Sequence, residues 1–218
     1  MHRRRFLAAF CVTVAFGACR ETKRVDAAEL LHVARTPVLH VTILAASTDP
    51  GVPIVREAIG RWRVELQRLG RTVQIDSGVV RPSAVPVETL RGAENSAWLG
   101  HGPAITRLRT ALADTPGDVI IVLSRTDVIS YGLRWHAGRP GVVVLRASDR
   151  WPLTLPNVAR NVVAHELGHV LGLVHNGDAA TLMCGRPATC RPSAFESATA
   201  RYFPLTPDDE AFLRTRWP

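Results

Sequence analysis

The sequence contains almost no lysine, and arginine carries nearly all of its positive charge. Lys23 is the only lysine among 27 basic residues, and the 218-residue chain has a net charge of +8. The arginines are scattered, with no run longer than residues 3–5. Nucleic-acid-binding proteins usually gather their cations on one face or in a tail. The composition therefore indicates a general bias towards arginine, and we expect no nucleic-acid partner.

The N-terminal apolar segment is too short for a lasting membrane-spanning helix. It covers residues 6–16, whereas a span needs about 20 residues. Three arginines precede it, and a positive region followed by a short apolar region is typical of an export signal. The order R-R-x-F-L at residues 3–7 also resembles the core of a twin-arginine signal. We expect residues 1–19 to direct export by the general secretory or the twin-arginine route, to the periplasm or the outside of the cell.

This leader ends in small residues followed by a cysteine. The sequence F-G-A-C at residues 16–19 resembles a bacterial lipobox, in which the cysteine becomes the lipidated N-terminus. The resemblance predicts a lipid anchor on Cys19 as the protein's membrane contact. Cleavage after Ala15 or Gly17, which would leave the mature chain without an anchor, is the alternative.

Cysteine is scarce, and its count bears on the anchor. The chain has four cysteines, of which Cys11 leaves with the leader. If Cys19 carries lipid, Cys184 and Cys190 remain, and in an oxidising compartment these two can pair. If Cys19 is an ordinary residue, the number is odd and one thiol stays free. The count therefore favours both the lipid anchor and a disulfide between Cys184 and Cys190.

The length of the chain suits one folded domain behind a leader. Residues 20–36 are mixed and polar and predict a tether, and residues 37–218 predict the domain, which we expect to be monomeric. The domain opens with a strand, a helix and a second strand, a βαβ unit that favours a parallel sheet. The expected strands are residues 38–46, 71–75, 118–123 and 141–147, the expected helices 53–69 and 103–113, and the expected loops 77–102 and 128–139.

The most informative stretch is H-E-L-G-H at residues 165–169. His165 and His169 are four apart, so on a helix they lie one turn apart on the same face. Two imidazoles placed in this way can hold one Zn²⁺. Glu166 lies about 100° around the helix from His165. That position does not suit a ligand, but it suits a base that takes a proton from water at the metal.

A third histidine follows, but a continuous helix would place it out of reach. His175 would then lie about 15 Å along the axis from His165. Gly172 can adopt a positive φ, end the helix and let the chain turn back towards the metal. Three neutral histidines leave one tetrahedral position for water, as in catalytic zinc sites. A structural zinc site would need a fourth protein ligand, for which Asp178 is the only nearby candidate.

The pattern H-E-x-x-H-x-x-G-x-x-H followed by a methionine resembles the signature of the metzincin zinc metalloproteases. The step from His175 to Met183, with Asp178 between them, most resembles the matrixin branch. One departure is Asn176, where matrixins usually carry Ser or Thr. The close match covers about twenty residues, and the rest of the chain resembles the family in the order of its elements. The alternatives are a core helix with incidental histidines and a degenerate relative that binds no metal.

The resemblance implies an α+β fold, with a mixed, mostly parallel twisted sheet, an antiparallel edge strand, a zinc helix and a C-terminal helix. The residue pattern starts the zinc helix near residue 156, ends it at Leu171, and makes Thr206 the cap of the last helix. In metzincins the substrate backbone pairs with the edge strand, and by resemblance we assign this role to residues 141–148. The resemblance also places Met183 under the zinc ligands as a hydrophobic base.

Together, the motif and the resemblance predict a zinc endopeptidase of the cell envelope or the extracellular space, acting on a peptide or protein substrate. In this hypothesis His165, His169 and His175 hold one catalytic Zn²⁺, and Glu166 is the catalytic base. The alternative is an envelope binding protein that keeps the fold without turnover. The glutamate argues against this alternative, because a binding protein needs no base beside its metal.

Overall fold

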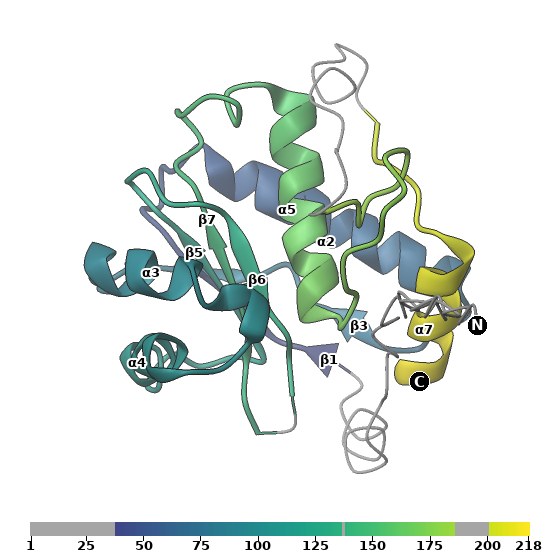
Figure 1. The fold of residues 1–218 in the computed structure, drawn as a ribbon, viewed down its shortest axis with the longest axis horizontal. Coiled ribbons are helices and arrows are strands. Elements are labelled where there is room, and N and C mark those ends of the chain that lie inside the picture. Colours follow the sequence, from purple (N-terminus) through teal and green to yellow (C-terminus); the bar gives the residue numbers. More distant parts are fainter. Residues whose placement is uncertain (1–37, 137, 186–200) are drawn as a thin grey trace, which may run out of the picture.

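The computed structural model describes residues 38–136, 138–185 and 201–218 (Figure 1). The export signal, the lipid anchor on Cys19 and the tether predicted for residues 20–36 lie outside these ranges, as does Cys190. Among the helices that the described ranges contain, none combines the length and the apolar character needed to cross a membrane.

A five-stranded sheet forms the centre of the fold (Figure 1). Its strands in spatial order are β4 (Val79–Arg81), β2 (Val41–Leu44), β5 (Val119–Leu123), β7 (Gly141–Leu145) and β6 (Tyr131–Leu133). The first four are parallel, and β6 runs antiparallel to β7. The mixed, mostly parallel sheet with an antiparallel edge strand is therefore confirmed.

The apolar run at residues 38–46 forms two short strands where the sequence predicted one. β1 (Val38–Leu39) pairs with β3 (Gln74–Ile75), and β2 joins the main sheet. The break falls at His40, whose backbone N–H donates to a carboxylate oxygen of Asp118 at 2.9 Å. The next N–H, of Val41, donates to Asp76 at 2.9 Å. Two acidic side chains thus take backbone donors that a continuous strand would use in its ladder.

Helices cover both faces of the sheet. They are α2 (Gly51–Arg68), α3 (Val87–Glu94), α4 (Pro103–Ala111), α5 (Pro156–Val170) and α7 (Pro207–Arg216), with a 3₁₀ turn at η1 (Ala97–Leu99). Successive residues of a strand point to opposite faces. Ile43 and Ile121 accordingly pack into the core of α2 and α5, whereas Leu44 and Ile120 pack into that of α3 and α4. The indole N–H of Trp62 on α2 donates to the carbonyl of Ala164 on α5 at 2.9 Å, which joins the two helices directly.

Two segments predicted as loops contain regular structure. Residues 77–102 contain β4, α3 and η1, and residues 128–139 contain β6. These elements are short, since β4 and β6 have three residues each, β4 has no fully buried residue and α3 buries only Leu90 and Ala93. Their apolar pattern is correspondingly weak, and the glycines and prolines around them suggested loops.

The assignment of the edge strand to residues 141–148 was wrong. β7 lies in the interior of the sheet between β5 and β6, and the antiparallel edge strand is β6. All five residues of β7 are buried. A continuous apolar run of this kind is typical of a strand covered on both faces. The run does not show which strands lie beside it in the sheet, because that depends on pairing with distant segments.

The C-terminal helix begins with the cap that the sequence predicted. The hydroxyl oxygen of Thr206 accepts from the backbone N–H of Asp209 at 3.1 Å, and the Asp209 carboxylate accepts from the Thr206 N–H at 3.3 Å. This reciprocal arrangement is a capping box. At the other end of α7, the indole N–H of Trp217 donates to the carbonyl of Leu171 at 3.1 Å. The last helix is thus tied to the end of α5.

Removing the cap should destabilise the protein measurably. We expect Thr206→Ala to lower the free energy of unfolding by about 1 kcal/mol, because the backbone N–H of Asp209 loses its acceptor. Thr215→Ala is the matched control, since the exposed Thr215 hydroxyl bonds only to the carbonyl of Ala211 within the helix. Urea unfolding of both variants measures the difference. Equal stability of the two would contradict the role of the cap.

Candidate metal centre

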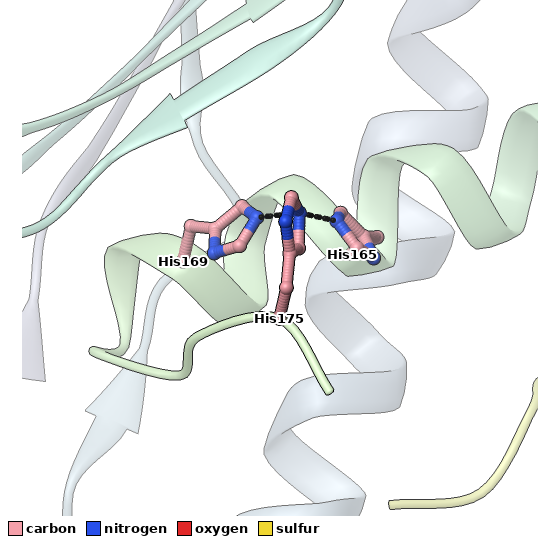
Figure 2. A group of neighbouring side chains, drawn as sticks. All are labelled: His165, His169 and His175. Atoms are coloured by element: carbon pink, nitrogen blue, oxygen red, sulfur yellow. Dashed lines mark hydrogen bonds between the residues drawn. The ribbon is translucent and has the colours of Figure 1, made fainter. Parts of the chain in front are cut away.

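Three histidines converge on one point at the C-terminal half of α5 (Figure 2). The Nε2 atom of His175 lies 3.1 Å from Nε2 of His165 and 3.1 Å from Nε2 of His169. Nitrogens bound tetrahedrally to one zinc at 2.0–2.1 Å would lie about 3.3 Å apart. The three nitrogens are therefore spaced as ligands of a single ion, as the motif predicted.

The other ring nitrogen of each helical histidine sets its tautomer. Nδ1 of His165 lies 2.8 Å from the carbonyl oxygen of Leu182, and Nδ1 of His169 lies 2.9 Å from that of Leu173. A carbonyl oxygen can only accept, so each Nδ1 carries the hydrogen and each neutral ring presents a lone pair at Nε2. The donor set thus fits a cation at the point where the lone pairs meet.

Burial keeps His169 in the form that binds metal. It lowers the pKa of His169 to about 4, although the hydrogen bond to the Leu173 carbonyl acts in the opposite direction. Metal ligands must be deprotonated, and metal binding otherwise has to displace a proton. At neutral pH this ring is already neutral.

The turn that returns His175 to the site depends on Gly172. Its φ is 99°, in the left-handed region that favours glycine. The N–H of Leu173 donates to the carbonyl of Gly168 at 2.9 Å, and the N–H of Gly172 to that of His169 at 3.0 Å. These two bonds form a Schellman motif and satisfy the last carbonyls of α5. The predicted role of Gly172 in ending the helix is confirmed.

Met183 lies against α5 between the two helical histidines. The side chain is fully buried, and a Cβ built on Gly168 would come within 2.6 Å of its sulfur. The residue before it, Leu182, supplies the carbonyl that accepts from His165. The backbone carbonyl of Met183 also accepts from the N–H of Asn176 at 2.9 Å. This turn therefore touches the segments that carry all three histidines.

Asn176, which differs from the matrixin pattern, ties the third histidine to the C-terminal helix. Its side-chain oxygen accepts from the Thr181 hydroxyl and from the N–H of Asp178, each at 3.0 Å. Its side-chain nitrogen donates to Asp209 at 3.2 Å. The sequence analysis missed this link. Its acceptor, Asp209, also belongs to the capping box at Thr206.

Glu166 is buried beside the three histidines but does not belong to the group of ligand atoms. Burial raises the pKa of Glu166 to about 8, and a hydrogen bond from the backbone of Gly132 opposes this shift. Gly132 lies in β6, and a Cβ there would come within 2.5 Å of the Glu166 carbonyl oxygen. The edge strand therefore contacts Glu166 directly, a role for Gly132 that the sequence analysis did not identify.

Asp178 does not complete the ligand set. Its carboxylate is exposed and accepts from the N–H of Ala180 at 2.9 Å. Within the described part of the chain, the group that could hold a metal consists of the three histidines alone. The arrangement is that of a site with a coordination position left for water or substrate.

Cys184, which follows Met183, is disulfide-bonded. Its predicted partner, Cys190, lies outside the described residues, so the pairing of these two cysteines stays a prediction.

The comparisons with known proteins add little to this picture. No family model matches the chain, and no curated protein matches it in sequence. A solved structure that it resembles is archaemetzincin from Methanopyrus kandleri, with a TM-score of 0.48 and 16% identity over 82% of this chain and 94% of that chain. A likeness of this degree carries no inference about activity. The matrixin branch stays a prediction from the motif.

Loss of one ligand should abolish metal binding. We expect His169→Ala to retain less than stoichiometric zinc after dialysis, because two remaining imidazoles hold the ion poorly. His101→Ala is the control, since this exposed histidine lies outside the ligand group. Elemental analysis of the purified variants gives the answer. Full zinc occupancy in His169→Ala would show that the ion binds elsewhere.

The link through Asn176 should contribute to metal affinity without contacting the ion. We expect Asn176→Ala to weaken zinc binding by about 10- to 100-fold, the usual effect of losing a group that orients a ligand. Competition with a chromogenic chelator at neutral pH measures the affinity. Asn95→Ala, at the exposed end of α3, is the matched control. An unchanged affinity in Asn176→Ala would mean that His175 is held by the chain fold alone.

Proposed function

We propose that the protein is a zinc-dependent endopeptidase of the metzincin type. The observation that carries this proposal is the convergence of three histidine Nε2 atoms next to a buried glutamate that is not a ligand. Three protein ligands suit catalysis, because a fourth position stays open. A zinc ion bound there would supply Lewis acidity to a peptide carbonyl and to water.

Glu166 acts as the general base in this proposal. Its carboxylate takes the proton of the attacking water and passes it to the leaving amine of the cleaved bond. A carboxyl group whose pKa is raised by burial accepts a proton more readily at neutral pH than an exposed one. The hydrogen bond from the backbone of Gly132 orients the carboxylate, which can still accept a proton.

The substrate binds along β6 rather than β7. β6 is the last strand of the sheet, so its outer edge has no partner among the described strands. Gly132 in β6 touches both the backbone of Glu166 and the Cβ of His169. An extended peptide that adds to this edge by β-augmentation therefore runs past the metal ligands and the base.

The setting of the enzyme is inferred from the sequence. The leader at residues 1–19 supports export, and the lipobox supports an anchor at Cys19 that leaves the domain tethered by residues 20–36. A peptide or protein substrate of the periplasm or the extracellular space fits this setting. The step from His175 to Met183 supports the matrixin branch within the clan.

Replacement of Glu166 separates an enzyme from a metal-retaining binding protein. We expect Glu166→Gln to keep the fold and the zinc of the wild type, while peptide hydrolysis falls by about 10²- to 10⁴-fold. Hydrolysis of a mixed peptide library is assayed by mass spectrometry, with zinc measured in each sample. Glu88→Gln, on the exposed first turn of α3, is the matched control.

Two outcomes would count against the proposal. A wild type that holds zinc but cleaves no peptide would favour the binding protein. A Glu166→Gln variant that cleaves as fast as the wild type would show that Glu166 is not the base.

A further inference from the structure

A cavity lies at the carboxyl ends of three parallel strands. Its volume is about 370 Å³, and residues at the ends of β2, β4 and β5 line it. In the sheet, β4 lies on one side of β2 and β5 lies on the other. The chain runs from β2 to β4 and then crosses to β5, so the order in which strands are added reverses at β2. In open α/β sheets, ligands bind in the crevice outside the carboxyl ends of the strands at such a switch point.

The walls of this cavity combine an apolar interior with a basic rim. Its apolar lining includes Val80, Val85, Val87, Leu90 and Val122. The polar lining consists of Ser47, Ser83, Ser124, Arg81 and Arg125, with no acidic residue. The volume is within the range of small-molecule sites, and such sites are usually apolar with a few polar groups that orient the ligand.

Within the described part of the chain, no acidic residue forms an ion pair with the two arginines of the rim. Arg81 is the last residue of β4 and pairs with Leu44 of β2. Leu44 in turn pairs with Val122 of β5. Arg125 follows the end of β5. Both side chains are exposed, and neither has a hydrogen bond or ion pair with any described residue. By contrast, Arg146, near the same edge of the sheet, is paired with Asp127 at 2.6 Å.

The cavity is separate from the metal site. Its lining comes from residues 45–47, 80–90 and 122–125 and includes no histidine, no Glu166 and no residue of β6. A ligand in the cavity would therefore not occupy the peptide site along β6.

We propose that this cavity binds a small organic anion. The apolar part of the ligand packs against the valines and Leu90, and its carboxylate or phosphate group lies between Arg81 and Arg125. A guanidinium matches both groups, because its N–H donors can bind two oxygens at once. The hydroxyls of the lining serines can supply further hydrogen bonds.

Binding is tested by calorimetry on the zinc-loaded protein with hexanoate, hexyl phosphate, hexanamide and inorganic phosphate. We expect hexanoate or hexyl phosphate to bind with a Kd of roughly 1 mM or tighter. The tighter of the two identifies the head group. Hexanamide should bind at least about tenfold more weakly, because it lacks the charge that the arginines recognise. Affinity for the anion should also fall as salt is added.

Substitutions locate the binding at the rim. Arg81→Gln and Arg125→Gln should each weaken binding of the preferred anion by about tenfold, since each removes a charge-assisted contact. Arg107→Gln, an exposed arginine of α4 outside the cavity, should leave it unchanged. Zinc content should stay the same in all three variants, because none of these arginines belongs to the group of candidate ligands.

Four results would overturn the proposal. The first is no binding of either hexyl compound, and the second is equal binding of hexanoate and hexanamide. The third is an effect of Arg81→Gln and Arg125→Gln no larger than that of Arg107→Gln. Inorganic phosphate that binds as tightly as hexyl phosphate would likewise exclude an organic ligand held by the apolar wall.

Discussion

The metal site depends on one reversal of the chain, at Gly172. Two ligands stand on α5, and the third reaches them only because the helix ends in a left-handed residue and the backbone turns back. The C-terminal helix closes over the same turn, since a Cβ at Gly172 would lie 3.0 Å from Nε of Arg216 and 3.1 Å from the ring of Phe212. A helix distant in sequence is therefore part of what holds the ligands together.

Close packing around α5 leaves no space for a side chain at three further glycines. Gly132 brings the edge strand against Glu166, Gly168 admits the sulfur of Met183, and Gly185 would collide with the His175 ring if it carried a Cβ. In each case the missing side chain lets another segment lie close to the three histidines or Glu166. Side chains held in this way are pre-organised, so metal or substrate binding does not have to order them.

The fold contains two distinct chemical environments, which share no lining residue. At one, α5 and the turn after it present three histidines, and burial lowers the pKa of His169 and of His175. At the other, the carboxyl ends of β2, β4 and β5 open into a cavity whose two arginines form no ion pair with any described residue.

Spacing within one or two helical turns was enough to predict the three candidate ligands, the turn at Gly172 and the cap at Thr206. Long apolar strands were equally predictable. Three features became visible only in the folded chain: β6 is the edge strand, Gly132 contacts Glu166, and Asn176 reaches Asp209. These features join segments far apart in the chain, and short edge elements bury too few side chains to leave a periodic pattern. Which distant segments come into contact depends on how the helices pack against the sheet.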